Sequence, residues 1–127
     1  MASPSIVPYL SYRNVDAALR FLSDAFGFEV SVRWEDGGVV QHAEITWSGS
    51  TVMLGTGDDQ TGPVTERSVG HGVYVVVEDV DEHFKRAREA GARVVFPPED
   101  TPWGTRRYRV LDLEGLEWSF GSYQPGQ

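Results

Sequence analysis

The hydrophobic pattern changes its period in a fixed order through residues 70–123. Valines at alternate positions (Val73, Val75, Val77) first predict a strand. Asp79 then precedes an amphipathic segment that stops at Gly91, and its apolar residues are spaced as on one face of a helix. A strand over 92–96, a proline-rich loop over 97–104 and a hairpin of 105–112 with 116–121 follow. The pattern therefore predicts a β-α-β-β-β order.

The first half of the chain repeats this order. A strand over 6–13 leads to Asn14, a favourable N-cap, and then to a helix that ends at Gly27. Further strands are expected over 28–35, 39–47 and 50–55. The repeat predicts an α+β fold of tandem βαβββ modules within one domain of 127 residues. Its expected parts are module one at about 5–56, a polar linker at 57–69 and module two at about 70–123.

These modules resemble the vicinal oxygen chelate superfamily of glyoxalases, bleomycin-resistance proteins and dioxygenases. The stretches that carry the resemblance are DVDEHFKRAREAGARVV and, after it, TRRYRVLDLEGLEWSFGSY. The D-x-E-G-x-x-W-x-F hairpin is the most specific part of the resemblance. The resemblance implies curled mixed sheets with helices outside and a ligand cleft. Unrelated activities share this scaffold, so the resemblance says more about fold than about function.

The resemblance also implies where a metal would be held. The four equivalent ligand positions are occupied here by Val7, Met53, Gly72 and Ser119. None of these side chains offers an imidazole or a carboxylate, so no metal and no other cofactor is expected. In this respect the chain resembles the metal-free bleomycin-resistance-like branch. His71 lies one residue from a ligand position and therefore points to the other face, unless a bulge turns it back.

The turns of the two hairpins decide which side chains face the cleft. A three-residue loop, 113–115, pairs Arg109 with Ser119, and a two-residue loop, 48–49, pairs Glu44 with Met53. The helix-covered face then takes Trp118. The expected ligand-binding residues are Val7, Tyr9, Ser11, Trp34, His42, Glu44, Met53, Tyr74, Trp103, Arg107, Arg109 and Ser119.

Several of these residues have structural alternatives. Arg107 and Arg109 could instead pair with neighbouring glutamates, and Trp34 and Trp103 could be loop anchors or part of an interface. No catalytic residue is assigned. His42 and Glu44, two positions apart on one strand face, are the candidates for acid–base chemistry or for a displaced metal site.

Charge and composition narrow the function. The net charge of −8 disfavours nucleic acid and anionic membranes and suits a cationic ligand, although it also serves solubility. There is no cysteine, no apolar run of membrane-spanning length and no signal-peptide pattern, so a cytoplasmic location is expected. We expect a metal-free protein that binds a planar or cationic antibiotic or metabolite. The alternatives are a lyase, isomerase or dioxygenase-like enzyme and a scaffold without a ligand.

The expected assembly is a homodimer with ligand sites at or near the subunit boundary, because one half-open module cannot close a cleft alone. The rival is a compact monomer.

Overall fold

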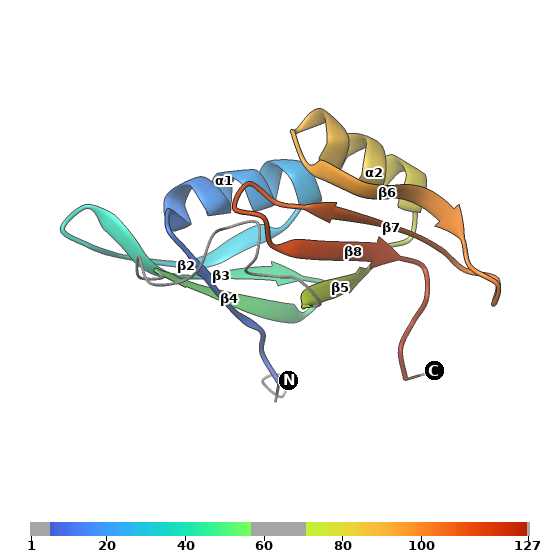
Figure 1. The fold of residues 1–127 in the computed structure, drawn as a ribbon. Helices are drawn as coiled ribbons and strands as arrows, with labels where there is room; N and C mark the ends of the chain where they lie inside the picture. The colour runs from blue at the N-terminus through green and yellow to red at the C-terminus, as the bar shows by residue number, and fades with distance from the viewer. Residues whose placement is uncertain (1–5, 57–70, 127) are drawn as a thin grey trace. The chain divides into compact units, whose positions relative to one another are not determined.

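The computed structural model describes residues 6–56 and 71–126. The chain divides into two compact units, Met1–Thr61 and Gly62–Gln127. Each unit contains one βαβββ module with a four-stranded mixed sheet and a single helix (Figure 1), which confirms the predicted α+β fold. The predicted linker at 57–69 lies outside the described residues. The predicted cleft between the modules remains a prediction.

The first unit is built from one helix and four strands: β1 Tyr9–Tyr12, α1 Val15–Phe26, β2 Glu29–Asp36, β3 Val39–Trp47 and β4 Ser50–Thr56. The sheet order is β1-β4-β3-β2, with β1 parallel to β4 and the other pairs antiparallel. The Asn14 side chain accepts a hydrogen bond from the Ala17 N–H and caps α1 as predicted. The apolar stripe of α1 is buried against one face of this sheet.

The second unit repeats the arrangement with β5 Gly72–Val76, α2 Val80–Glu89, β6 Arg93–Asp100, β7 Arg106–Leu111 and β8 Glu117–Gly121. The sheet order is β5-β8-β7-β6, with β5 parallel to β8. Asp79 caps α2 by accepting a hydrogen bond from the Glu82 N–H. No helix in the described part of the chain is both long enough and apolar enough to cross a membrane.

Two predicted boundaries were wrong. The first strand begins at Tyr9 rather than residue 6, so Val7 lies outside the sheet. β6 continues to Asp100, although residues 97–104 were predicted to be a loop. Prolines are tolerated here because β6 is an edge strand and its pairing with β7 shifts register between Phe96 and Glu99.

Both predicted hairpin registers are confirmed: Glu44 lies opposite Met53, and Arg109 lies opposite Ser119. Ser48 and Gly49 have φ of 46° and 84°, the two left-handed positions of a type I′ turn. Gly115 has φ of 82°, as expected for the last residue of the longer loop.

The D-x-E-G-x-x-W-x-F hairpin is held by a buried carboxylate. Asp112 Oδ1 accepts hydrogen bonds from the N–H groups of Glu114 (2.9 Å) and Leu116 (3.0 Å). Asp112 Oδ2 accepts one from the indole Nε1 of Trp118 at 3.0 Å. Trp118 is completely buried on the helix-covered face, as predicted, together with Tyr108, Val110 and Phe120. The motif spacing thus has a structural cause, since one side chain fixes both the loop and the core tryptophan.

Candidate functional site

The strand alternation of β7 separates a core face from an open face in the second unit. Tyr108 and Val110 are fully buried, whereas Arg107 and Arg109 point to the other side. Burial raises the pKa of the Tyr108 phenol, so this hydroxyl stays protonated and contacts His83 Nδ1 at 2.6 Å. The core face is therefore structural, and candidate chemistry is confined to the open face and its flanking loops.

A pocket of about 540 Å³ lies at one end of this open face. Its lining consists of Tyr74, Thr101, Trp103, Thr105, Arg106, Arg107 and Tyr123. All of these residues belong to the second unit. Aromatic rings from three separate segments therefore meet beside two arginines, which is an arrangement suited to a small organic molecule.

Tyr74 forms one wall because its partner strand carries a glycine. A Cβ at Gly121 would lie 2.8 Å from the Tyr74 hydroxyl, so only a residue without a side chain leaves room for this ring. The hydroxyl donates a hydrogen bond of 2.8 Å to the backbone carbonyl of Tyr123, and burial raises the pKa of the Tyr74 phenol. The C-terminal segment is thereby tied to the open face, and Tyr123 is brought into the pocket.

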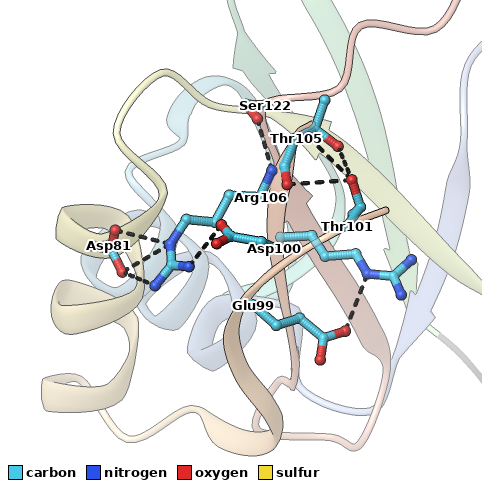
Figure 2. Close-up of polar contacts among 8 residues, drawn as sticks. Asp81, Glu99, Asp100, Thr101, Thr105, Arg106 and Ser122 are labelled. Carbon is cyan, nitrogen blue, oxygen red and sulfur yellow. Dashed lines mark hydrogen bonds and ion pairs between the residues drawn. The ribbon is translucent and has the colours of Figure 1, made fainter. Parts of the chain in front are cut away.

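Trp103 is presented by a short, internally bonded loop. The Thr101 N–H donates to the Thr105 carbonyl at 2.8 Å, and the two threonine hydroxyls lie 2.8 Å apart. The Thr105 N–H donates to Thr101 Oγ1 at 3.1 Å, which closes the loop (Figure 2). Trp103 between them remains 61% exposed. A rigid loop that holds a large exposed ring favours stacking on a planar ligand.

Arg106 is committed to the protein. Its guanidinium binds both oxygens of Asp81 from α2, with the shortest distance 3.0 Å, and reaches Asp100 at 3.0 Å (Figure 2). The hydrogen bonds to Asp81, and to a smaller extent the one to Asp100, raise the pKa of this guanidinium. Arg106 thus joins β7 to the start of α2 and the end of β6, with its charge compensated by two carboxylates.

Arg107 is held differently. Its Nε donates to Glu99 Oε1 at 3.3 Å, and its Cζ lies 5.6 Å from the Phe96 ring centroid and 5.8 Å from that of Trp103. These distances lie within cation–π range. Arg109, two residues further along, instead bonds Ser119 Oγ at 2.9 Å and lies 3.4 Å from Glu117. Arg109 and Ser119 therefore share the open face of Arg107 but do not line the pocket.

In the first unit the same sheet positions carry other residues. Tyr9 lies over Gly55 in the same way as Tyr74 lies over Gly121. A Cβ at Gly55 would overlap the Tyr9 hydroxyl, so the glycine leaves room for this ring. His42 Nε2 and Glu44 Oε2 form a half-buried pair at 3.1 Å, and Trp34 lies opposite His42 on β2. His42 and Glu44, the candidates for acid–base chemistry, are thus in contact within this unit.

The structure gathers three of the predicted ligand-binding residues, Tyr74, Trp103 and Arg107, in one pocket. Val7 precedes the first sheet, and the other first-unit candidates are Tyr9, Ser11, Trp34, His42, Glu44 and Met53. Sequence reasoning missed Thr101, Thr105, Arg106 and Tyr123. The symmetric T-P-W-G-T segment around Trp103 was the one available signal for the threonines.

The residues at the family's metal positions do not fit a metal. Val7, Met53 and Gly72 have no nitrogen or oxygen donor in their side chains, and Ser119 Oγ already accepts the hydrogen bond from Arg109. Among residues 6–56 and 71–126, no three His, Asp or Glu side chains are grouped so that they could hold an ion. These four side chains therefore do not form a site for a divalent metal.

The chain contains two βαβββ modules in tandem, an arrangement that defines a class of proteins. Comparison of the sequence with protein families places the chain in this class. The family described as the glyoxalase/bleomycin resistance protein/dioxygenase superfamily matches residues 6–120, and the chain belongs to it. An uncharacterized protein of Mycobacterium bovis is 34% identical over 126 residues, covering 93% of this chain and 82% of the relative.

Solved structures agree on the fold. TioX from Micromonospora sp. ML1 is 38% identical with a TM-score of 0.76, covering 98% of this chain and 99% of TioX. The fosfomycin resistance protein FosX from Listeria monocytogenes is 15% identical with a TM-score of 0.75, covering 98% of this chain and 97% of FosX. At that identity the second likeness concerns the fold alone.

Proposed function

We propose that this protein binds a planar small molecule without a metal and holds it chemically unchanged, as a member of the bleomycin-resistance-like branch of its superfamily. The observation that carries the proposal is the pocket in the second unit, whose walls include Tyr74, Trp103 and Tyr123. The ligand class is a planar or cationic antibiotic or metabolite. The net charge of −8 supports attraction of a cation from a distance.

Stacking supplies the affinity in this proposal. The 61% exposed Trp103 ring gains apolar burial when a flat molecule covers it, and the closed threonine loop limits the entropy lost on binding. No histidine is among the described residues that line the pocket, and Arg106 and Arg107 make ion pairs with carboxylates. These features support binding rather than turnover.

A thermal-stability screen tests the proposal, because a ligand that binds only the folded state raises the melting temperature. The panel should contain planar aromatic antibiotics, both cationic and neutral, and non-planar compounds of similar size. We expect planar members alone to stabilise the protein, and mass spectrometry to recover them unmodified. Release of a chemically altered ligand, or stabilisation by non-planar compounds alone, would contradict the proposal.

Substitution of two exposed tryptophans tests where the ligand binds. Trp103→Ala is expected to remove the stabilisation, whereas Trp34→Ala, which deletes a 56% exposed indole outside the pocket, is expected to retain it. The reverse result would move the site to the first unit. Elemental analysis of the purified protein is expected to find less than one transition metal per chain. One metal per chain, lost on substitution of His42 or Glu44, would overturn the metal-free part.

The contact between His42 Nε2 and Glu44 Oε2 at 3.1 Å supports a second candidate function, an enzyme of the lyase or isomerase type. A histidine beside a carboxylate on an open sheet face can move a proton to or from a bound substrate. If a bound compound is converted, Glu44→Gln should abolish conversion without preventing binding. Equal conversion by the variant would exclude this pair as the catalytic group.

A further inference from the structure

We infer that the pocket selects flat molecules that carry a carboxylate or another pair of adjacent hydrogen-bond acceptors, and that the Arg107 guanidinium binds this group. The inference rests on the proposed function, because it specifies the ligand of the same pocket. It follows from how differently three arginines on one strand, Arg106, Arg107 and Arg109, use their hydrogen-bond donors.

Arg106 and Arg109 each engage more than one nitrogen of the guanidinium within the protein. Arg106 uses Nε and both terminal nitrogens on Asp81 and Asp100, so its contribution to the pocket is a compensated ion cluster. Arg109 donates a hydrogen bond from Nε to Ser119, and its Nη1 pairs with Glu117. Arg109 does not line the pocket.

Of the two arginines that line the pocket among the described residues, Arg107 is the one with both terminal nitrogens available to a ligand. A guanidinium has five N–H groups, and among the residues that the structure describes Arg107 donates a hydrogen bond from its Nε–H alone, to Glu99. Within the described residues, the two terminal nitrogens make no further hydrogen bond. The side chain is 40% exposed, so water satisfies these donors until a ligand displaces it.

The fork of Arg107 is held ready for a ligand. The nearby rings of Phe96 and Trp103 and the bond to Glu99 restrict a side chain that would otherwise lose rotamer entropy on binding. The two terminal nitrogens of a planar guanidinium match the spacing of two carboxylate oxygens. A molecule with its ring against Trp103 and its acceptors toward Arg107 uses both features together.

The same geometry discriminates among charges. The attraction of cations by the acidic chain acts over long range, whereas a cation inside the pocket meets the terminal N–H groups of Arg107 at close range. A flat anion or a neutral acceptor-bearing ring is therefore favoured over a flat cation that has no acceptor pair. This narrows the ligand class from any planar compound to one with a defined polar edge.

Calorimetric titration with three matched probes tests the inference: 2-naphthoate, 2-naphthylmethanol and 2-naphthylmethylammonium. We expect the parent protein to bind 2-naphthoate about tenfold more tightly than the other two, the difference that a paired charge-assisted contact supplies. Arg107→Gln should remove that preference and leave the affinity for the alcohol within about twofold, because stacking on Trp103 is retained.

Two further variants sharpen the test. Arg107→Lys keeps the charge but lacks the planar fork, so it should lose nearly as much 2-naphthoate affinity as Arg107→Gln. Arg88→Gln removes the same charge from α2, outside the pocket, and should leave all three affinities within about twofold. Circular dichroism and thermal melting confirm that each variant folds.

The outcomes separate the inference from the proposed function. A parent protein without preference for 2-naphthoate, or an Arg107→Lys variant with full affinity, overturns the inference while Trp103-dependent stacking stands. Failure of all three probes to bind, or equal binding by Trp103→Ala, overturns both the inference and the proposed function at this pocket.

Discussion

Replacing Asp112 by asparagine tests the account of the C-terminal hairpin. The substitution keeps the size of the side chain, which is 1% exposed, and changes one oxygen into an amide. The amide oxygen can still accept the hydrogen bonds from the Glu114 and Leu116 N–H groups. The amide nitrogen, however, would replace the oxygen that accepts from the Trp118 indole, so that two donors face each other in a buried site.

The magnitude follows from counting these bonds. A lost hydrogen bond to a charged group costs about 1.5–3 kcal/mol, and a buried donor left without an acceptor costs about 1–3 kcal/mol. Removal of the buried charge offsets part of this cost. We expect Asp112→Asn to lower the free energy of unfolding by about 2 kcal/mol. Asp112→Ala, which leaves three donors without their acceptor, should cost about 4 kcal/mol.

Urea unfolding of a double-mutant cycle provides the assay. Trp118→Phe removes the indole donor, so its cost should be about 1–2 kcal/mol smaller in the Asp112→Asn background than in the parent. Asp36→Asn, an exposed residue at the end of β2, is the control for loss of one negative charge and should change stability by less than about 0.5 kcal/mol. Equal stability of Asp112→Asn and the parent, or additive effects in the cycle, would refute the reasoning.

Three further predictions follow from the fold. Trp118→Ala should lower the free energy of unfolding by about 3–5 kcal/mol, since the ring is fully buried, and a variant that melted like the parent would contradict this. The hydrogen bond from Arg33 holds the pKa of Asp16 below its usual value of 3.8, so the stabilising contribution of this carboxylate is present above that value and disappears as the pH falls through the folded pKa. Urea unfolding should therefore show a deficit for Asp16→Asn at neutral pH that vanishes on acidification, whereas a constant deficit would argue against this ion pair. We also expect a homodimer by light scattering and its dissociation by Trp103→Glu, because a subunit boundary would cover the exposed indole; a monomer at all concentrations would exclude it.

The sequence by itself determined the two modules, the helix starts and the hairpin registers. These features depend on neighbouring residues. Asn14 and Asp79 cap helices through contacts three residues away, and the Ser48-Gly49 turn fixes which side chains of β3 and β4 share a face. The length of a single turn predicted that Trp118 lies in the core and that Arg107 lies on the opposite face.

Only the tertiary structure decided which open-face residues act together. Arg106 and Arg107 are adjacent and chemically identical in the sequence. Arg106 binds Asp81, 25 positions earlier, through Nε and a terminal nitrogen, whereas Arg107 binds Glu99 through Nε and, within the described residues, keeps its terminal nitrogens for a ligand. Tyr123 enters the pocket through a hydrogen bond from Tyr74, 49 positions away. The strand character of residues 97–100 depended on an edge position that no local pattern encodes. Periodicity reports the face on which a side chain lies, whereas the partners that it meets there are set by the packing of distant segments.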